Sequence, residues 1–127
     1  PPSGNYLDAY RQLSPSLRAD KACGPIIQQM ASPFAGAIDF YAALREAKVP
    51  AQISLYPGET TATDETHLFH IPSNRLRAMQ ENLAWFDFWL RDRRDRDLDD
   101  RGAFDRWAKM AAQWKTRCVQ TRGAERR

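Results

Sequence analysis

The sequence predicts an α/β fold in which a strand, a helix and a second strand form a parallel unit that is followed by long helices. Three observations lead to this prediction. Residues 25–30 form a short apolar, β-branched run behind Gly24, which is typical of a buried strand. Residues 34–48 place apolar side chains at steps of three and four, which is helical spacing. Residues 51–56 alternate between apolar and polar, as a strand does.

The order of strand, helix and strand implies that the two strands are parallel, because a parallel partner is reached only through a crossover connection. We therefore expect residues 26–29 and 53–56 to be neighbouring parallel strands, with the helix of residues 34–48 covering one face. Parallel strands are normally buried within larger sheets, and two strands alone have little apolar area to offset their ordering entropy. The rest of the chain does not read as strand, so this unit is expected to need strands from elsewhere.

A short helix is expected before this unit and a long one after it. Residues 7–13 can form one or two turns that end before Pro15, because a residue that precedes proline avoids the helical region. Residues 73–91 form the long helix, which Ser73 or Asn74 can cap. Its apolar stripe steps by three, four, three and four residues and consists of Leu76, Met79, Leu83, Phe86 and Leu90.

The end of the chain is expected to be a charged connection and a last helix. Residues 91–101 carry charges of alternating sign, which is typical of a solvated linker or of an extension of the preceding helix. Residues 102–119 are predicted to be helical, with Trp107 and Trp114 covering apolar surface. Trp85, Phe86 and Trp89 in the preceding helix are expected to be largely buried, because aromatic side chains at helical spacing are usually core.

The composition is that of one folded domain. The chain has 127 residues, of which 43% are hydrophobic and 11% aromatic, and its formal charge is +3. The excess charge comes largely from the last residues, so we expect no nucleic-acid binding. No apolar run approaches the roughly 20 residues of a membrane span, so no membrane contact is expected. Cys23 and Cys118 lack metal-site spacing and are read as free thiols. The chain begins with Pro1 and not with methionine, so we expect a processed chain, a partial reading frame or an excised segment.

One stretch carries the clearest resemblance to a known family. Tyr56-Pro57-Gly58-Glu59 ends the second strand, Thr66-His67-Leu68-Phe69 follows a polar loop, and the long helix finishes in Trp85-Phe86-Asp87-Phe88-Trp89-Leu90. This order resembles the histidine end of the prolyl-oligopeptidase-type serine peptidases, which have the α/β-hydrolase fold. The resemblance covers residues 5–91. Pro72, Arg75 and Asn82 make it most similar to the branch that includes the lasso-peptide isopeptidases.

The resemblance implies a partial α/β-hydrolase fold and a serine peptidase that cleaves peptide or isopeptide bonds through an acyl-serine intermediate. Residues 1–92 would then be the C-terminal part of the catalytic domain, and residues 93–127 a charged linker and helical tail. His67 would be the general base and then the general acid. It is expected in an exposed loop just past the second strand. The implied partners are a peptide substrate in the parent enzyme and the missing N-terminal half of the hydrolase domain, with no metal or organic cofactor.

Two parts of the catalytic triad are absent from the sequence. No serine has the flanking glycines of the G-x-S-x-G elbow. The acid of the family follows the strand that corresponds to residues 26–29, where this chain has no carboxylate before Asp39. Residues 60–64 resemble an insertion before the histidine. We therefore expect the chain alone to be inactive. The alternative is a non-catalytic, degenerate hydrolase remnant that acts in packing or partner binding.

Other interpretations of the same loop stay open at this point. His67 can be a surface histidine without a catalytic role. A metal pair of His67 and His70 is not favoured, because two histidines without a third ligand are a weak site. Glu59, Asp64 and Glu65 enrich the loop in carboxylates, and one of them could orient His67.

Overall fold

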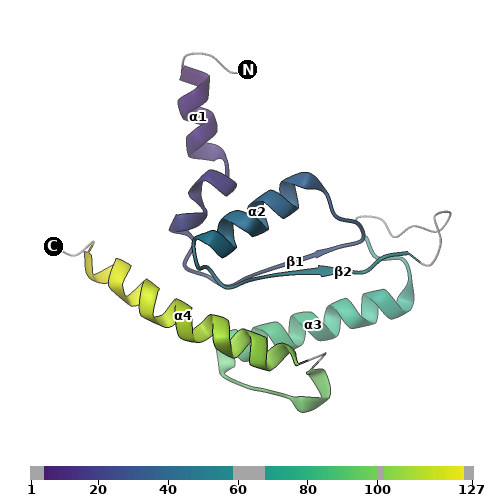
Figure 1. Ribbon diagram of the computed structural model, residues 1–127. Coiled ribbons are helices and arrows are strands. Elements are labelled where there is room, and N and C mark those ends of the chain that lie inside the picture. Colours follow the sequence, from purple (N-terminus) through teal and green to yellow (C-terminus); the bar gives the residue numbers. More distant parts are fainter. Residues whose placement is uncertain (1–4, 59–67, 100–101, 125–127) are drawn as a thin grey trace.

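The computed structural model describes residues 5–58, 68–99 and 102–124 and has a mixed α/β fold with one two-stranded parallel sheet (Figure 1). The elements are α1 (Asn5–Leu13), a 3-10 helix η1 (Ser16–Lys21), β1 (Ile26–Met30), α2 (Ala35–Glu46), β2 (Ala51–Leu55), α3 (Pro72–Arg91), a 3-10 helix η2 (Arg96–Leu98) and α4 (Ala103–Ala124). None of the described helices is both long enough and apolar enough to cross a membrane.

The predicted strand–helix–strand unit is confirmed. β1 and β2 pair in parallel, from Ile26 opposite Ala51 to Met30 opposite Leu55, and α2 lies over one face of the pair (Figure 1). α2 cannot continue past Lys48, because the backbone of this residue is left-handed, with a φ of 61°. The next residue, Val49, is buried and leads to β2. The second strand ends one residue earlier than predicted, at Leu55.

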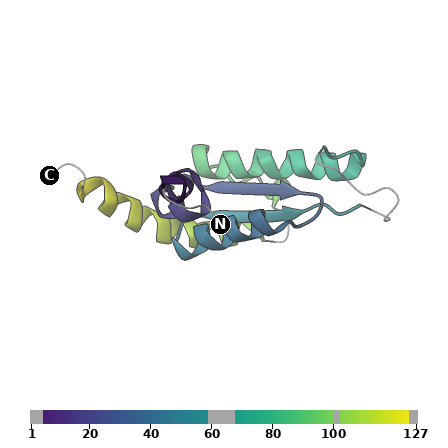
Figure 2. The same ribbon diagram turned by 90° about the horizontal axis from the view of Figure 1, so that it is seen from above.

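Alternate residues of the strands face opposite layers, as the two-residue period requires. On one side, Ile26 and Ala51 pack with Leu44 of α2 and with Ala19 of η1. On the other side, Ile27 packs against a cluster formed by α3 and α4. The sheet therefore lies between α2 and α3 (Figures 1 and 2), and α4 packs against α3.

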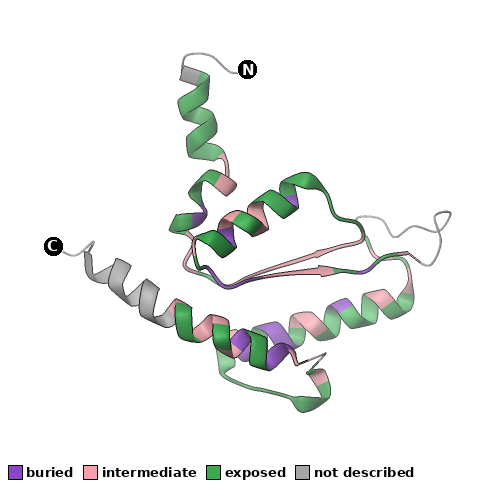
Figure 3. Cartoon of the chain, in the orientation of Figure 1, coloured by how far each residue is buried: buried purple, intermediate pink, exposed green. Residues whose placement is uncertain are grey.

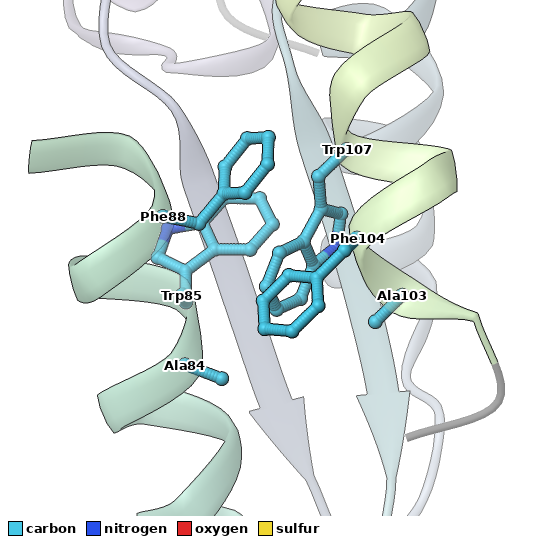
Figure 4. Packing of buried hydrophobic residues seen from close by; sticks show 6 residues of the cluster. All are labelled: Ala84, Trp85, Phe88, Ala103, Phe104 and Trp107. Atoms are coloured by element: carbon cyan, nitrogen blue, oxygen red, sulfur yellow. The ribbon is translucent and has the colours of Figure 1, made fainter. Parts of the chain in front are cut away.

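The core between α3 and α4 is aromatic. It consists of Ala84, Trp85, Phe88, Ala103, Phe104 and Trp107 (Figure 4). The rings of Trp85 and Trp107 meet edge to face with centroids 5.1 Å apart, and such pairs add about 0.5–1.5 kcal/mol to the burial of their area. Trp107 is 1% exposed, and Trp114 contacts Trp89 at 5.9 Å. The prediction that both tryptophans of the last helix cover apolar surface is confirmed.

The connection between α3 and α4 is a turn and not an extension of α3. Asp92 has a left-handed φ of 51° and ends the helix. Asp95 then caps η2 by accepting a hydrogen bond from the backbone N–H of Asp97 over 3.1 Å. Residues 92–97 are exposed, which agrees with the expectation of a solvated linker. The proposed domain division at residue 92 stays a prediction.

Two predictions about α3 are wrong. The helix begins at Pro72 behind Ile71, and neither Ser73 nor Asn74 caps it. Proline suits the first helical position because it has no N–H to leave unpaired there. Of the three aromatic residues expected to be buried, Trp85 is 1% exposed and Trp89 partly buried, but Phe86 is 53% exposed.

The apolar stripe of α3, from Leu76 to Leu90, faces solvent. Exposed residues run along this helix (Figure 3). The buried face consists of Ala78, Ala84, Trp85 and Phe88, and it includes the partly buried Glu81. Small alanines let the helix approach the sheet closely, and Glu81 meets polar groups of the strands. The sheet thus selects the face of α3 that matches its own polar surface.

Candidate functional site

The loop that joins β2 to α3 is the candidate site, because the resemblance places the catalytic histidine in it. His67 lies outside the described residues, as do Glu59, Asp64, Glu65 and the insertion-like residues 60–64. The expectation that His67 is exposed therefore stays a prediction. Both ends of the loop are described. They are the residues up to Gly58 and from Leu68 onward.

The two ends of the loop are held together at Tyr56. This residue follows β2 and is 6% exposed, and its ring lies 5.2 Å from that of Phe69 just beyond the loop. Nδ2 of Asn74, in the first turn of α3, donates to the carbonyl oxygen of Pro57 over 3.0 Å. A ring contact and the hydrogen bonds of the Asn74 amide to the carbonyl oxygens of Tyr56 and Pro57 therefore close the base of the loop. Asn74 was expected to cap α3 but anchors the loop instead.

Beneath this anchor lies a polar cluster that the sequence did not reveal. The Glu81 cluster consists of Gln29, Gln52, Ser54, Tyr56 and Glu81. Oε1 of Glu81 accepts from Nε2 of Gln52 and from Oγ of Ser54, each over 2.5 Å. Oε2 accepts from Nε2 of Gln29 and from the Tyr56 hydroxyl, each over 2.7 Å. All four donors come from the strands or their ends, and the acceptor comes from the middle of α3.

The hydrogen bonds in the cluster explain why the carboxylate of Glu81 can lie partly buried against the sheet. An ionised carboxylate offers only acceptor sites, and the four donors supply both oxygens with partners. Charge-assisted hydrogen bonds are short and about twice as strong as neutral ones. The signal in the sequence was weak. It consists of polar residues at alternate positions of the strands, Gln29 in one and Gln52 and Ser54 in the other, together with a glutamate on the opposite side of α3 from the apolar stripe.

The last helix is joined to this cluster by Trp107. Its indole Nε1–H donates to Oε1 of Gln52 over 2.5 Å, while Nε2 of the same amide donates to Glu81. Gln52 therefore uses both ends of its amide, which fixes the orientation of its side chain. The aromatic core and the Glu81 cluster are thus parts of one packed interface.

A cavity of about 790 Å³ lies beside β2. The backbone N–H of Ile26 donates to Pro50, and that of Tyr56 to Met30, each over 2.9 Å. In a parallel ladder, alternate residues of a strand direct their backbone N–H and C=O groups to opposite sides. The backbone groups of residues 51, 53 and 55 therefore point away from β1. The cavity is lined by all of β2 and by side chains of both charge signs, namely Arg77, Glu81, Asp97, Asp99 and Arg106. These mixed charges indicate no single class of substrate.

The described segment between β1 and α2, where the resemblance expects the acid, contains no carboxylate. β1 is followed at residues 31–34 by Ala-Ser-Pro-Phe, and Asp39 lies exposed within α2. His70 is exposed at the end of the loop. Within the described ranges, no group of three histidine, cysteine or acidic side chains is placed to hold a metal ion. Cys23 is a free, partly buried thiol.

Comparison with known proteins agrees in part with the resemblance read from the sequence. No family model matches the chain. Over 87 residues, or 68% of its length, the chain is 31% identical to the lasso peptide isopeptidase AtxE2 of Asticcacaulis excentricus. The matched segment spans 12% of that protein. The similarity supports a relationship to a peptidase, and it concerns a small part of the relative.

Proposed function

We propose that this chain corresponds to the C-terminal segment of a serine peptidase of the prolyl-oligopeptidase type, whose parent activity is the hydrolysis of peptide or isopeptide bonds. The observation that carries the proposal is the 31% identity over 87 residues to a lasso peptide isopeptidase. The order of parallel strands, loop and long helix is compatible with the histidine end of an α/β-hydrolase, in which catalytic loops follow the carboxyl ends of strands.

In this proposal His67 is the triad histidine. It would take the proton of the serine hydroxyl as general base and return a proton to the leaving amine as general acid. The anchor at the base of its loop supports this assignment, because an imidazole acts only when it is held in a productive position. Tyr56, Phe69 and Asn74 hold the two ends of that loop.

The remaining part of the active site would come from the missing N-terminal half of the hydrolase domain. β1 offers a place for it. In β1, the backbone N–H and C=O groups of residues 26, 28 and 30 point toward β2. Those of residues 27 and 29 therefore point away from it, to the open edge of the sheet. A further parallel strand on this edge would bury β1 on both sides, as is usual for parallel sheets. The nucleophile and the oxyanion donors would then belong to that half.

A non-catalytic role is the second candidate, and one observation favours it. The segment after β1 has no carboxylate up to α2, although the family places its acid there. Without the acid, the tautomer of the imidazole is not held, and turnover in a complete triad falls by about ten-thousandfold. In this alternative, the chain is a degenerate remnant in which packing or partner binding has replaced catalysis.

A chimera separates the two candidates. The segment of the isopeptidase that matches this chain is replaced by the corresponding residues of the chain, and cleavage of a lasso peptide is measured. Under the peptidase proposal the chimera retains weak cleavage above background. His67→Ala abolishes that cleavage, and His70→Ala retains it as the matched control. A chimera that folds but is as inactive as its His67→Ala variant would favour the non-catalytic remnant.

A further inference from the structure

The edge of β2 that faces away from β1 opens into the cavity of about 790 Å³, which every residue of this strand lines. The backbone N–H and C=O groups of residues 51, 53 and 55 point to this edge. Within the described residues, no strand pairs with them. We propose that the cavity binds an extended peptide segment of a partner protein, which adds to the sheet as a third strand beside β2.

The size of the cavity matches one short strand. Residues of a strand advance by about 3.3 Å, neighbouring strands lie about 4.8 Å apart, and stacked layers lie about 10 Å apart. A five-residue strand between two layers therefore occupies about 800 Å³. The sheet lies between α2 and α3 (Figures 1 and 2), and both helices line the cavity, through Tyr41 and Glu81. A strand in the cavity would therefore continue the sheet between the same two layers.

The surroundings of the cavity favour a single strand over a second copy of this chain. η2 and α4 also line the cavity, through Asp97 and Trp107. Trp107 donates a hydrogen bond to Gln52 of β2, and Met110 lines a smaller cavity together with Pro50 just before β2. A second copy that paired through β2 would bring its own η2 and α4 along the same edge, into the space that its strand needs. A peptide segment without such flanking helices avoids this conflict.

The two walls of the cavity indicate which side chains the segment would carry. Ala51 packs on the side of α2, and Ile53 shares that side because alternate residues of a strand face the same layer. Gln52 faces α3, where it donates to Glu81. Side chains of neighbouring strands that face the same layer contact one another. The segment is therefore expected to direct apolar residues toward α2 and polar residues toward α3.

The charges that line the cavity restrict the polar residues. Arg77 is an exposed residue of α3 that lines the cavity, and it favours one acidic residue in the segment. Asp97 and Asp99 also line the cavity, so several carboxylates would be repelled. The expected occupant is thus an extended segment that alternates apolar with polar residues and has one acidic residue. This inference does not depend on the proposed peptidase function, because it uses only the edge of β2 and its cavity.

The test uses a fluorescein-labelled peptide of seven residues, in which valine alternates with threonine and the central threonine is replaced by glutamate. Fluorescence anisotropy is measured as the purified chain is added, and saturable binding is expected. Two further peptides carry N-methyl groups, one on the valines and the other on the polar residues. Because alternate residues direct their N–H groups to opposite sides, only one of these two loses the donors that face β2. It should bind about tenfold more weakly than the other.

A substitution in β2 tests the same pairing from the side of the protein. Ile53→Pro removes a backbone N–H that points into the cavity and away from β1, and proline is tolerated at such positions of edge strands. It should weaken binding about tenfold. Ile53→Ala is the matched control, because it shortens the same side chain but keeps the N–H. It should bind within about threefold of the wild type.

Circular dichroism establishes that each variant is folded. If Ile53→Pro were unfolded, Arg77→Glu on the exposed side of α3 would decide. It should weaken binding of the glutamate peptide and strengthen binding of a peptide with lysine at its centre, and an unchanged preference would contradict the proposal.

Four other results would overturn the proposal. The first is the absence of saturable binding, and the second is equal binding of the two methylated peptides. The third is an equal effect of Ile53→Pro and Ile53→Ala, which would show that the backbone N–H is not used. The fourth is a peptide-free dimer, detected by light scattering, that Ile53→Pro converts to monomers. That result would assign the edge of β2 to a second copy of the chain.

Discussion

The Tyr56 hydroxyl donates to Oε2 of Glu81 over 2.7 Å, and this bond joins the end of β2 to the middle of α3. The same tyrosine contacts Phe69 on the far side of the loop that contains His67. The Tyr56 side chain therefore takes part both in the packing of α3 on the sheet and in the anchoring of the loop. Disturbing the Glu81 cluster should affect both.

Glu81→Leu should lower the free energy of unfolding by on the order of 2 kcal/mol, because it leaves Gln29, Gln52, Ser54 and Tyr56 without their shared acceptor. Urea denaturation measures the change. Glu46→Leu is the control, since Glu46 is exposed at the end of α2 and should alter stability little. Equal effects of the two substitutions would contradict a stabilising role for the cluster.

Trp107→Ala should cost about 3 kcal/mol, because it removes a fully buried ring from the aromatic core. Trp107→Phe keeps a ring but removes the donor to Gln52, and it should cost less, about 1 kcal/mol for the lost hydrogen bond. Tyr10→Ala on the exposed face of α1 controls for the loss of an aromatic side chain. A Trp107→Ala protein as stable as the wild type would show that α4 does not pack as described.

Truncation after Arg101 should lower the melting temperature by roughly 10 °C or more, since it uncovers Trp85 and Phe88 on α3. Lower solubility is expected for the same reason. Truncation after Trp114 leaves the whole aromatic cluster in place and should have a smaller effect. Thermal unfolding followed by circular dichroism compares the three proteins. If truncation after Arg101 left the melting temperature unchanged, a packed tail would be refuted.

The chain alone should not hydrolyse peptides. It lacks a nucleophile elbow and the usual acid, and an oxyanion hole built partly from the backbone after the nucleophile cannot form without that segment. A fluorophosphonate probe and a chromogenic peptide ester test this, with an active serine hydrolase as positive control. Labelling of any serine, or turnover that disappears in His67→Ala, would identify a working enzyme.

The local pattern of the sequence was sufficient for the two strands and the α-helices, but not for the 3-10 helices η1 and η2. β1, α2 and β2 follow from changes between the two-residue and the helical period, and the parallel pairing follows from their order. The helices around residues 72–91 and 103–124 follow from their spacing in the same way. Such signals lie within a few residues of one another, so they need no knowledge of distant contacts.

Which face of α3 is inward was decided only by the tertiary structure. The strongest apolar stripe of the sequence, from Leu76 to Leu90, predicts a packing face but does not identify the surface that it covers. The near side of the sheet presents Gln29, Gln52 and Ser54, and their donors require an acceptor once they leave water. Glu81 supplies that acceptor, and Ala78 and Ala84 allow close approach. The polar match therefore sets the rotation of α3 and turns the apolar stripe outward.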